Sequence, residues 1–165
     1  MTAIAHNNKF QFLPFLISLL ITFAIAAVAS LVTIPQVQGW YTTLNKPGFN
    51  PPKQLFGPVW SVLYVMIAVA AYLVWKQRDN SASYHTTRWV YFLQLLLNFS
   101  WSIVFFGLHQ ILPAFIIIVL LWLSIVATMY YFARFSKLAC WLLLPYLLWV
   151  SFASVLNFSI YMLNG

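Results

Sequence analysis

The fold is decided by Leu112 to Val126, LPAFIIIVLLWLSIV, in which Ser124 is the only polar residue. A membrane-spanning β-strand would alternate apolar and polar side chains, so this run excludes a β-barrel. A helix that is apolar on every side lies either in a large core or in a lipid bilayer. The run therefore predicts a buried or membrane-spanning helix.

The rest of the chain has the same character, with 64% hydrophobic and 5% charged residues over 165 positions and a mean hydropathy of +0.90. A helix needs about 20 apolar residues to cross the bilayer core. Stretches of that kind, free of Asp, Glu, Lys and Arg, are Phe10 to Thr33, Leu55 to Trp75, Trp89 to Leu108, Ile111 to Phe132 and Leu138 to Leu163. We expect an all-α integral membrane protein: one domain over residues 1–165, folded as a five-transmembrane-helix bundle with a lid loop at 34–54. The first stretch has four more behind it and no evident cleavage site, so we expect it to remain in the protein.

The net charge of +7 is sorted by loop. One set of loops carries Lys9, Lys76, Arg78, Arg88, Arg134 and Lys137, whereas the other carries Lys46 and Lys53. The positive-inside rule then predicts a cytoplasmic N-terminus and an external C-terminus in a plasma-type membrane, although an outer-membrane setting would remove the basis of that rule. Because this sorting accounts for the charge, we expect the lipid bilayer as partner and no nucleic acid.

The segment Trp40 to Trp60, WYTTLNKPGFNPPKQLFGPVW, is the irregular and aromatic part of the chain. Each proline holds its own φ near one value and restricts the residue before it. Lys46-Pro47 and Asn50-Pro51-Pro52 therefore predict a stiff cover over one end of the bundle.

Polar side chains recur on one face of each of two predicted spans: Gln94 and Asn98 in the third, and Asn157 in the fifth, beyond a kink that we expect at Pro145. Amides in hydrocarbon are costly unless they are paired. They either hydrogen-bond between helices or line a pocket with apolar walls. For such a pocket, the wall residues are Trp60, Tyr64, Trp101, Phe105 and Trp149.

Residues for metal binding or thermal catalysis are scarce. The single cysteine, Cys140, is expected to be an inert core residue, and His6, His85 and His109 lie apart in terminal or loop positions without carboxylate partners. We expect no metal site, no catalytic residue and no bound cofactor.

Four blocks of sequence, in this order, resemble the TspO/MBR family of translocator and tryptophan-rich sensory proteins. The first block is Trp40, Tyr41, Leu44, Lys46, Pro47, Pro51 and Pro52, followed by Gly57 to Trp60; the second is Tyr72 to Lys76. The third is Gln94, Asn98, Trp101 and Phe105 to Gly107, and the fourth is Pro145, Tyr146, Trp149, Phe152, Leu156 and Asn157. The resemblance covers all but the first few residues.

The resemblance implies a five-helix bundle, often a homodimer, whose cavity opens toward the loop between the first two helices. It implies a receptor or carrier that binds porphyrins such as protoporphyrin IX and other flat hydrophobic ligands, and that acts in tetrapyrrole regulation or stress response. The ligand-binding residues carried over are Trp40, Tyr41, Trp60, Tyr64, Gln94, Asn98, Trp101, Phe105, Trp149, Phe152, Ala153 and Asn157. For Lys46 and Lys53, porphyrin propionates and phospholipid head groups both stay open as partners.

Two other functions remain. One is a light-dependent, protoporphyrin-degrading enzyme, which a Trp-rich pocket permits even without an acid or a Cys–His pair. The other is a structural membrane protein, since Ala26 and Ser30 in the first span permit close helix packing. Cholesterol is a doubtful ligand, because Phe158 and Met162 stand where the family's cholesterol pattern has Tyr and Arg.

Overall fold

The computed structural model describes residues 9–79 and 81–165, and within them it contains helices but no strand. The helices are α1 (Phe12–Gln38), α2 (Trp40–Thr43), the 3-10 turn η1 (Lys53–Leu55), α3 (Phe56–Lys76), α4 (Ala82–Ser102), the π-helical turn η2 (Ile103–Gly107), α5 (Ile111–Ala133), α6 (Lys137–Leu142) and α7 (Leu144–Asn164). These form 5 segments long and apolar enough to span a membrane, which confirms the predicted fold class.

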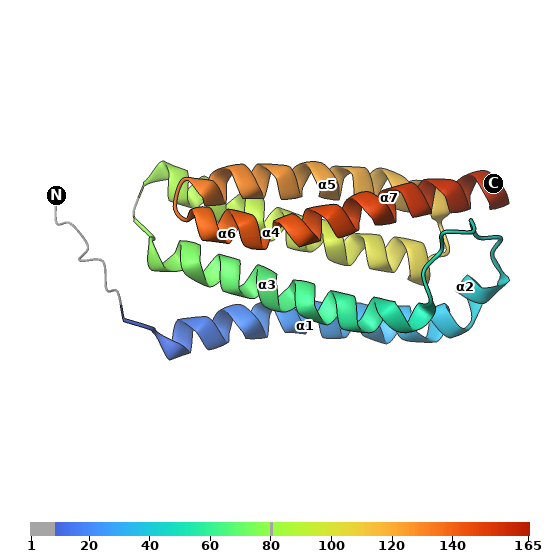
Figure 1. Cartoon of the computed structure of the whole chain (residues 1–165), viewed down its shortest axis with the longest axis horizontal. Coiled ribbons are helices and arrows are strands. Elements are labelled where there is room, and N and C mark those ends of the chain that lie inside the picture. Colours follow the sequence, from blue (N-terminus) through green and yellow to red (C-terminus); the bar gives the residue numbers. More distant parts are fainter. Residues whose placement is uncertain (1–8, 80) are drawn as a thin grey trace.

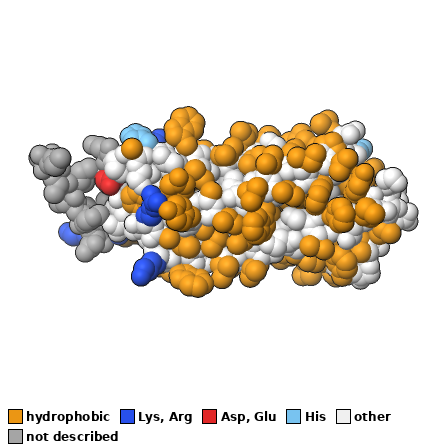
Figure 2. All heavy atoms as spheres, turned by 90° about the horizontal axis from the view of Figure 1, so that it is seen from above, with side chains coloured by type: hydrophobic (Ala, Val, Ile, Leu, Met, Phe, Trp, Pro, Cys, Tyr) orange, Lys and Arg blue, Asp and Glu red, His pale blue; other side chains and the backbone are white. Residues whose placement is uncertain are grey.

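The long helices lie side by side along one axis (Figure 1). α4 packs on α5, α5 on α7 and α1 on α3. Hydrophobic side chains cover the middle of the outer surface, while Lys and Arg gather toward the end that carries the N-terminus (Figure 2). A bilayer requires apolar side chains on the outer surface and backbone hydrogen bonds that are satisfied within the helices, and this structure has both.

The first helix is longer than predicted. α1 continues through Pro35 to Gln38, and the N–H of Gly39 then donates to the carbonyl of Pro35 at 2.9 Å. A proline inside a helix removes one backbone hydrogen bond, and here the helix continues past it. The lid loop therefore begins at Gly39 rather than at residue 34, and it contains the short helix α2.

The third span also begins earlier, at Ala82 instead of Trp89. The Ser81 hydroxyl accepts from the Tyr84 N–H at 3.1 Å, which caps the helix. The hydroxyl and N–H of Ser81 donate in turn to Asp79, and these bonds hold the pKa of that exposed carboxyl below its usual value. His85, expected in a loop, therefore lies in α4, whereas His6 falls outside the described residues.

The expected kink at Pro145 is confirmed as a break between α6 and α7. The Leu143 N–H turns back to the Cys140 carbonyl at 3.1 Å, and Pro145 then lies in the first turn of α7. There its missing N–H leaves no gap in the helical bonding.

Candidate ligand-binding site

Two of the predicted amides hydrogen-bond between helices. Asn98 accepts from the Tyr64 hydroxyl at 2.9 Å and donates to the Tyr146 hydroxyl at 3.1 Å. Asn157 accepts from Trp101 Nε1 at 3.1 Å and donates to the Ile111 carbonyl at 3.0 Å. For these two residues, the structure favours the first of the two sequence-based interpretations.

Gln94 differs from both. Its side chain is 1% exposed, and neither amide atom has a hydrogen-bond partner among the described residues. It lies on the same face of α4 as Asn98, one turn away, but it lines none of the cavities described below.

A small internal cavity collects many of the predicted ligand-binding residues. Its volume is about 30 Å³, far below the roughly 300–1,000 Å³ of ordinary ligand pockets. The predicted residues in its wall are Tyr41, Trp60, Trp101, Phe105, Trp149, Ala153 and Asn157. The structure thus brings these side chains together, but around almost no free volume.

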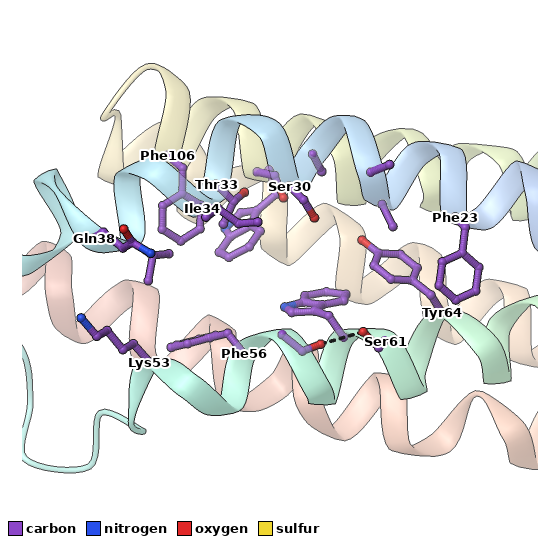
Figure 3. A pocket seen from close by; sticks show the side chains of 18 of the residues that line it. Phe23, Ser30, Thr33, Ile34, Gln38, Lys53, Phe56, Ser61, Tyr64 and Phe106 are labelled. Carbon is purple, nitrogen blue, oxygen red and sulfur yellow. Dashed lines mark hydrogen bonds between the residues drawn. The ribbon is translucent and has the colours of Figure 1, made fainter.

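A larger cavity of about 600 Å³ lies between α1 and α3 and is partly open to the outer surface, because Phe23, Ala27 and Ser61 of its lining are exposed (Figure 3). We call it the α1–α3 cavity. One face of α1 forms one wall, with Phe23, Ala26, Ala27, Ser30 and Thr33. The opposite wall comes from α3 and α4 and includes the predicted residues Trp60, Tyr64 and Trp101.

The position of α1 explains this space. Near its start, the Ser18 hydroxyl donates to the Ala68 carbonyl at 2.8 Å, and the hydroxyls of Thr22 and Tyr91 lie 3.4 Å apart. Near its end, Gln36 Oε1 lies 2.9 Å from His109 Nε2. Between these attachments, small side chains of α1 face α3 and leave the cavity unfilled.

The two cavities share an aromatic partition formed by Phe56, Trp60, Trp101 and Phe106. Trp60 stacks on Tyr64 with ring centroids 5.4 Å apart. Trp101 stacks on Phe105 at 5.5 Å, and its indole is held by Asn157. A ligand in the α1–α3 cavity would therefore contact the predicted site from its α1 side.

The remaining predicted residues lie further out. Phe152 shares with Trp149 an apolar groove between α3 and α7, of about 570 Å³. Trp40 lines none of the three cavities and stacks on His109, with ring centroids 4.3 Å apart. Trp40, Gln94 and Asn98 line none of the three cavities, so these three predicted residues are separated from the free volume in this structure.

The lid loop is held closed by several hydrogen bonds. The Tyr41 hydroxyl donates to Asn50 Oδ1 at 2.6 Å. The Asn164 side chain, at the end of α7, accepts from the Asn45 N–H at 2.9 Å and donates to the Asn45 carbonyl at 2.8 Å. Lys46 Nζ donates to the carbonyls of Tyr41 and Leu44, at 2.8 and 2.7 Å. The lid loop, predicted as a stiff cover, is therefore hydrogen-bonded both within itself and to α7.

Sequence reasoning missed the α1 wall of the larger cavity. A signal was present, because Ala26 and Ser30 are spaced by four residues on one face of the helix. Their small size predicts close helix packing; in the structure Ala26 does pack against the core, and both residues also line the cavity. His, Cys, Asp and Glu of residues 9–79 and 81–165 form no group of three that could hold a metal ion.

Comparison with known proteins agrees with this architecture. Residues 18–163 match the TspO/MBR family. The chain is 43% identical over 148 residues to the tryptophan-rich protein TspO of Archaeoglobus fulgidus, covering 90% of this chain and 95% of that protein. It is 35% identical over 149 residues to the tryptophan-rich sensory protein of Cereibacter sphaeroides, covering 89% and 92%. It is also 36% identical over 123 residues to the human translocator protein, covering 74% and 73%. With five apolar helices and a match over most of its length, the chain is a multi-pass membrane protein that belongs to the TspO/MBR family.

Proposed function

We propose that this protein is a membrane receptor or carrier that binds porphyrins such as protoporphyrin IX and other flat hydrophobic molecules inside its helix bundle. The observation that carries the proposal is the α1–α3 cavity of about 600 Å³, which adjoins the cluster of predicted ligand residues. Apolar and aromatic walls with a few polar groups are typical of sites for such ligands. The names of the relatives, translocator and sensory proteins, support a transport or sensing role.

In the proposed complex, the ligand lies against the aromatic partition. Trp60 and Tyr64 offer a stacked pair of rings to one face of a flat molecule. Displacement of Trp60 would join the α1–α3 cavity to the small cavity, where Trp149 and Ala153 lie. Because the lid is hydrogen-bonded closed, we propose that this rearrangement, rather than opening of the lid, enlarges the site.

Titration with protoporphyrin IX, followed by tryptophan fluorescence, tests the proposal. We expect saturable quenching with the full-length protein and a clear loss of affinity in Trp60→Phe. Trp89→Phe is the matched control, because Trp89 is 76% exposed and lines none of the described cavities. Quenching that never saturates, or equal affinity in the two variants, would contradict the proposal.

A second candidate function is light-dependent degradation of the bound porphyrin. It is favoured by the presence of two indoles, Trp60 and Trp101, in the wall of the same cavity. Illumination of the complex should then give a defined product that is lost when both residues are changed to Phe. Bleaching that proceeds equally without these two indoles would exclude it.

A further inference from the structure

We propose that the α1–α3 cavity selects an amphipathic organic acid, with the anionic group held by Lys53 at the cavity mouth and the hydrophobic body directed toward Tyr64. This inference rests on the proposed function and deepens it by assigning the charge and the orientation of the ligand. It also separates the two lid lysines, since Lys53 contacts the ligand and Lys46 does not.

The cavity is polar at one end and apolar at the other. Lys53 and Gln38 face each other at one end, whereas Phe23 and Tyr64 lie at the opposite end (Figure 3). The Tyr64 hydroxyl is already bonded to Asn98, so this end offers a ligand mainly ring surface. Between the two ends, the Ser61 hydroxyl already donates to the Gly57 carbonyl at 2.9 Å, and Ser30 and Thr33 add hydroxyls to the wall. A ligand that matches this gradient has one polar end and a long or flat apolar body.

The charge at the mouth has no counter-ion in the described part of the chain. The Lys53 ammonium makes no hydrogen bond or ion pair with the described residues. The chain contains one acidic side chain, that of Asp79, which follows the far end of the 21-residue helix α3. At 1.5 Å per residue that helix is about 30 Å long, several times the screening length of about 8 Å at physiological salt. Lys53 is exposed at the cavity mouth, so its ammonium is free to pair with an anionic ligand.

Two further features favour an anion at this position. Lys53 begins η1, which runs directly into α3, so the positive end of the α3 dipole lies at the same mouth. Lys46 provides the contrast within the lid, because its ammonium is already bonded to the carbonyls of Tyr41 and Leu44. Of the two lid cations, Lys53 is the one placed to bind an acid.

The test compares an acid with its ester, which has the same body without the charge. Full-length protein in zwitterionic nanodiscs is titrated with protoporphyrin IX and with its dimethyl ester, and tryptophan quenching gives each Kd. We expect Lys53→Gln to weaken binding of the acid by about tenfold, the effect of one charge-assisted hydrogen bond, and to leave binding of the ester unchanged. Lys53→Arg should restore binding of the acid.

Lys137→Gln is the matched control, because it removes the same charge at the start of α6 and lines none of the described cavities. Equal binding of acid and ester by the unchanged protein, or an equal effect of Lys53→Gln and Lys137→Gln, would overturn this inference alone. Absence of saturable binding by either compound would overturn the proposed function and this inference with it.

A second arm identifies the source of the acid. Palmitate and its methyl ester are added as competitors of protoporphyrin IX. Displacement by palmitate but not by its ester supports a site for hydrophobic acids in general. No displacement, together with Lys53-dependent binding of protoporphyrin, supports a site for tetrapyrrole acids. Displacement by the methyl ester as strong as by palmitate would contradict selection of the charge.

Discussion

At the scale of single residues, Gln94 and Asn98 show that of two buried amides on one helix face, one can be hydrogen-bonded and the other not. Asn98 accepts from Tyr64 and donates to Tyr146, which ties three segments of the bundle together. Gln94 is equally buried but has no hydrogen-bond partner in the described part of the chain. Burying an amide without a partner lowers stability, whereas a satisfied amide can raise it.

These environments predict opposite effects of the same substitution. Asn98→Leu leaves two buried hydroxyls without their partner and should lower the free energy of unfolding by about 1–3 kcal/mol. Gln94→Leu removes a polar group that is already unpaired, so it should leave stability unchanged or raise it. Unfolding by SDS in mixed micelles measures both variants, and a loss in Gln94→Leu as large as in Asn98→Leu would refute the argument.

At the scale of elements, the attachment of the lid and the shape of α1 define the space around the predicted site. The lid is joined to α7 through Asn45 and Asn164, which are 119 positions apart in sequence. α1 is attached near both ends and lines the cavity between them. Each element therefore yields a separate prediction.

Asn164→Ala should loosen the lid without unfolding the bundle. The Asn45 N–H loses its acceptor, so its hydrogen exchange should become faster. The Gly39 N–H, bonded to the Pro35 carbonyl, should exchange as before. Met162→Ala, which truncates a side chain that is 65% exposed, serves as control. Unchanged exchange at Asn45 in Asn164→Ala would show that the lid is held mainly by its other contacts.

Ala27→Leu should fill part of the α1–α3 cavity and weaken protoporphyrin binding by at least about tenfold, the effect of roughly 1.4 kcal/mol of lost contact. Ala24→Leu adds the same atoms to an exposed position of α1 that does not line the cavity. Its affinity should equal that of the unchanged protein, as measured by fluorescence titration. Equal affinities in the two variants would place the ligand elsewhere.

At the scale of the whole molecule, the distribution of charge predicts orientation in the membrane. Lys76 ends α3 and Arg78 follows it, whereas the lid carries Lys46 and Lys53 at the other end of the bundle. Further basic residues lie near the N-terminus and around the connection between α5 and α6. The excess of positive charge is therefore on the side of the membrane where α3 ends and α4 begins. The positive-inside rule then predicts that the lid faces away from the cytoplasm.

Cysteine labelling tests this orientation. In a Cys140→Ser background, Gly48→Cys places a thiol on the lid, where an added Cβ would meet nothing within 4 Å. Ala82→Cys places one at the exposed start of α4. With an impermeant maleimide and intact cells, Gly48→Cys should react at once and Ala82→Cys only after the membrane is permeabilised. The reverse pattern would contradict the charge argument.

The sequence alone determined the fold class and most helix positions, because a bilayer requires about 20 apolar residues per span and excludes unpaired charge from them. It also predicted the break at Pro145, since proline lacks the N–H that a helix interior needs. The predicted start of α4 is wrong because the Ser81 cap extends that helix beyond its apolar stretch. The predicted end of α1 is wrong because the helix continues past Pro35 to Gln38.

Only the tertiary structure decided where free volume lies. The predicted residues Trp149, Ala153 and Asn157 do lie together, yet close packing of the side chains around them leaves about 30 Å³ there. The larger space arises because α1 is attached at both ends while Ala26, Ala27 and Ser30 leave its inner face short of side-chain volume. The difference between Lys46 and Lys53 is likewise tertiary, since it depends on which carbonyls the folded lid presents to each ammonium. Composition and spacing record which side chains are available, whereas cavities and hydrogen-bond partners depend on how separate helices pack together.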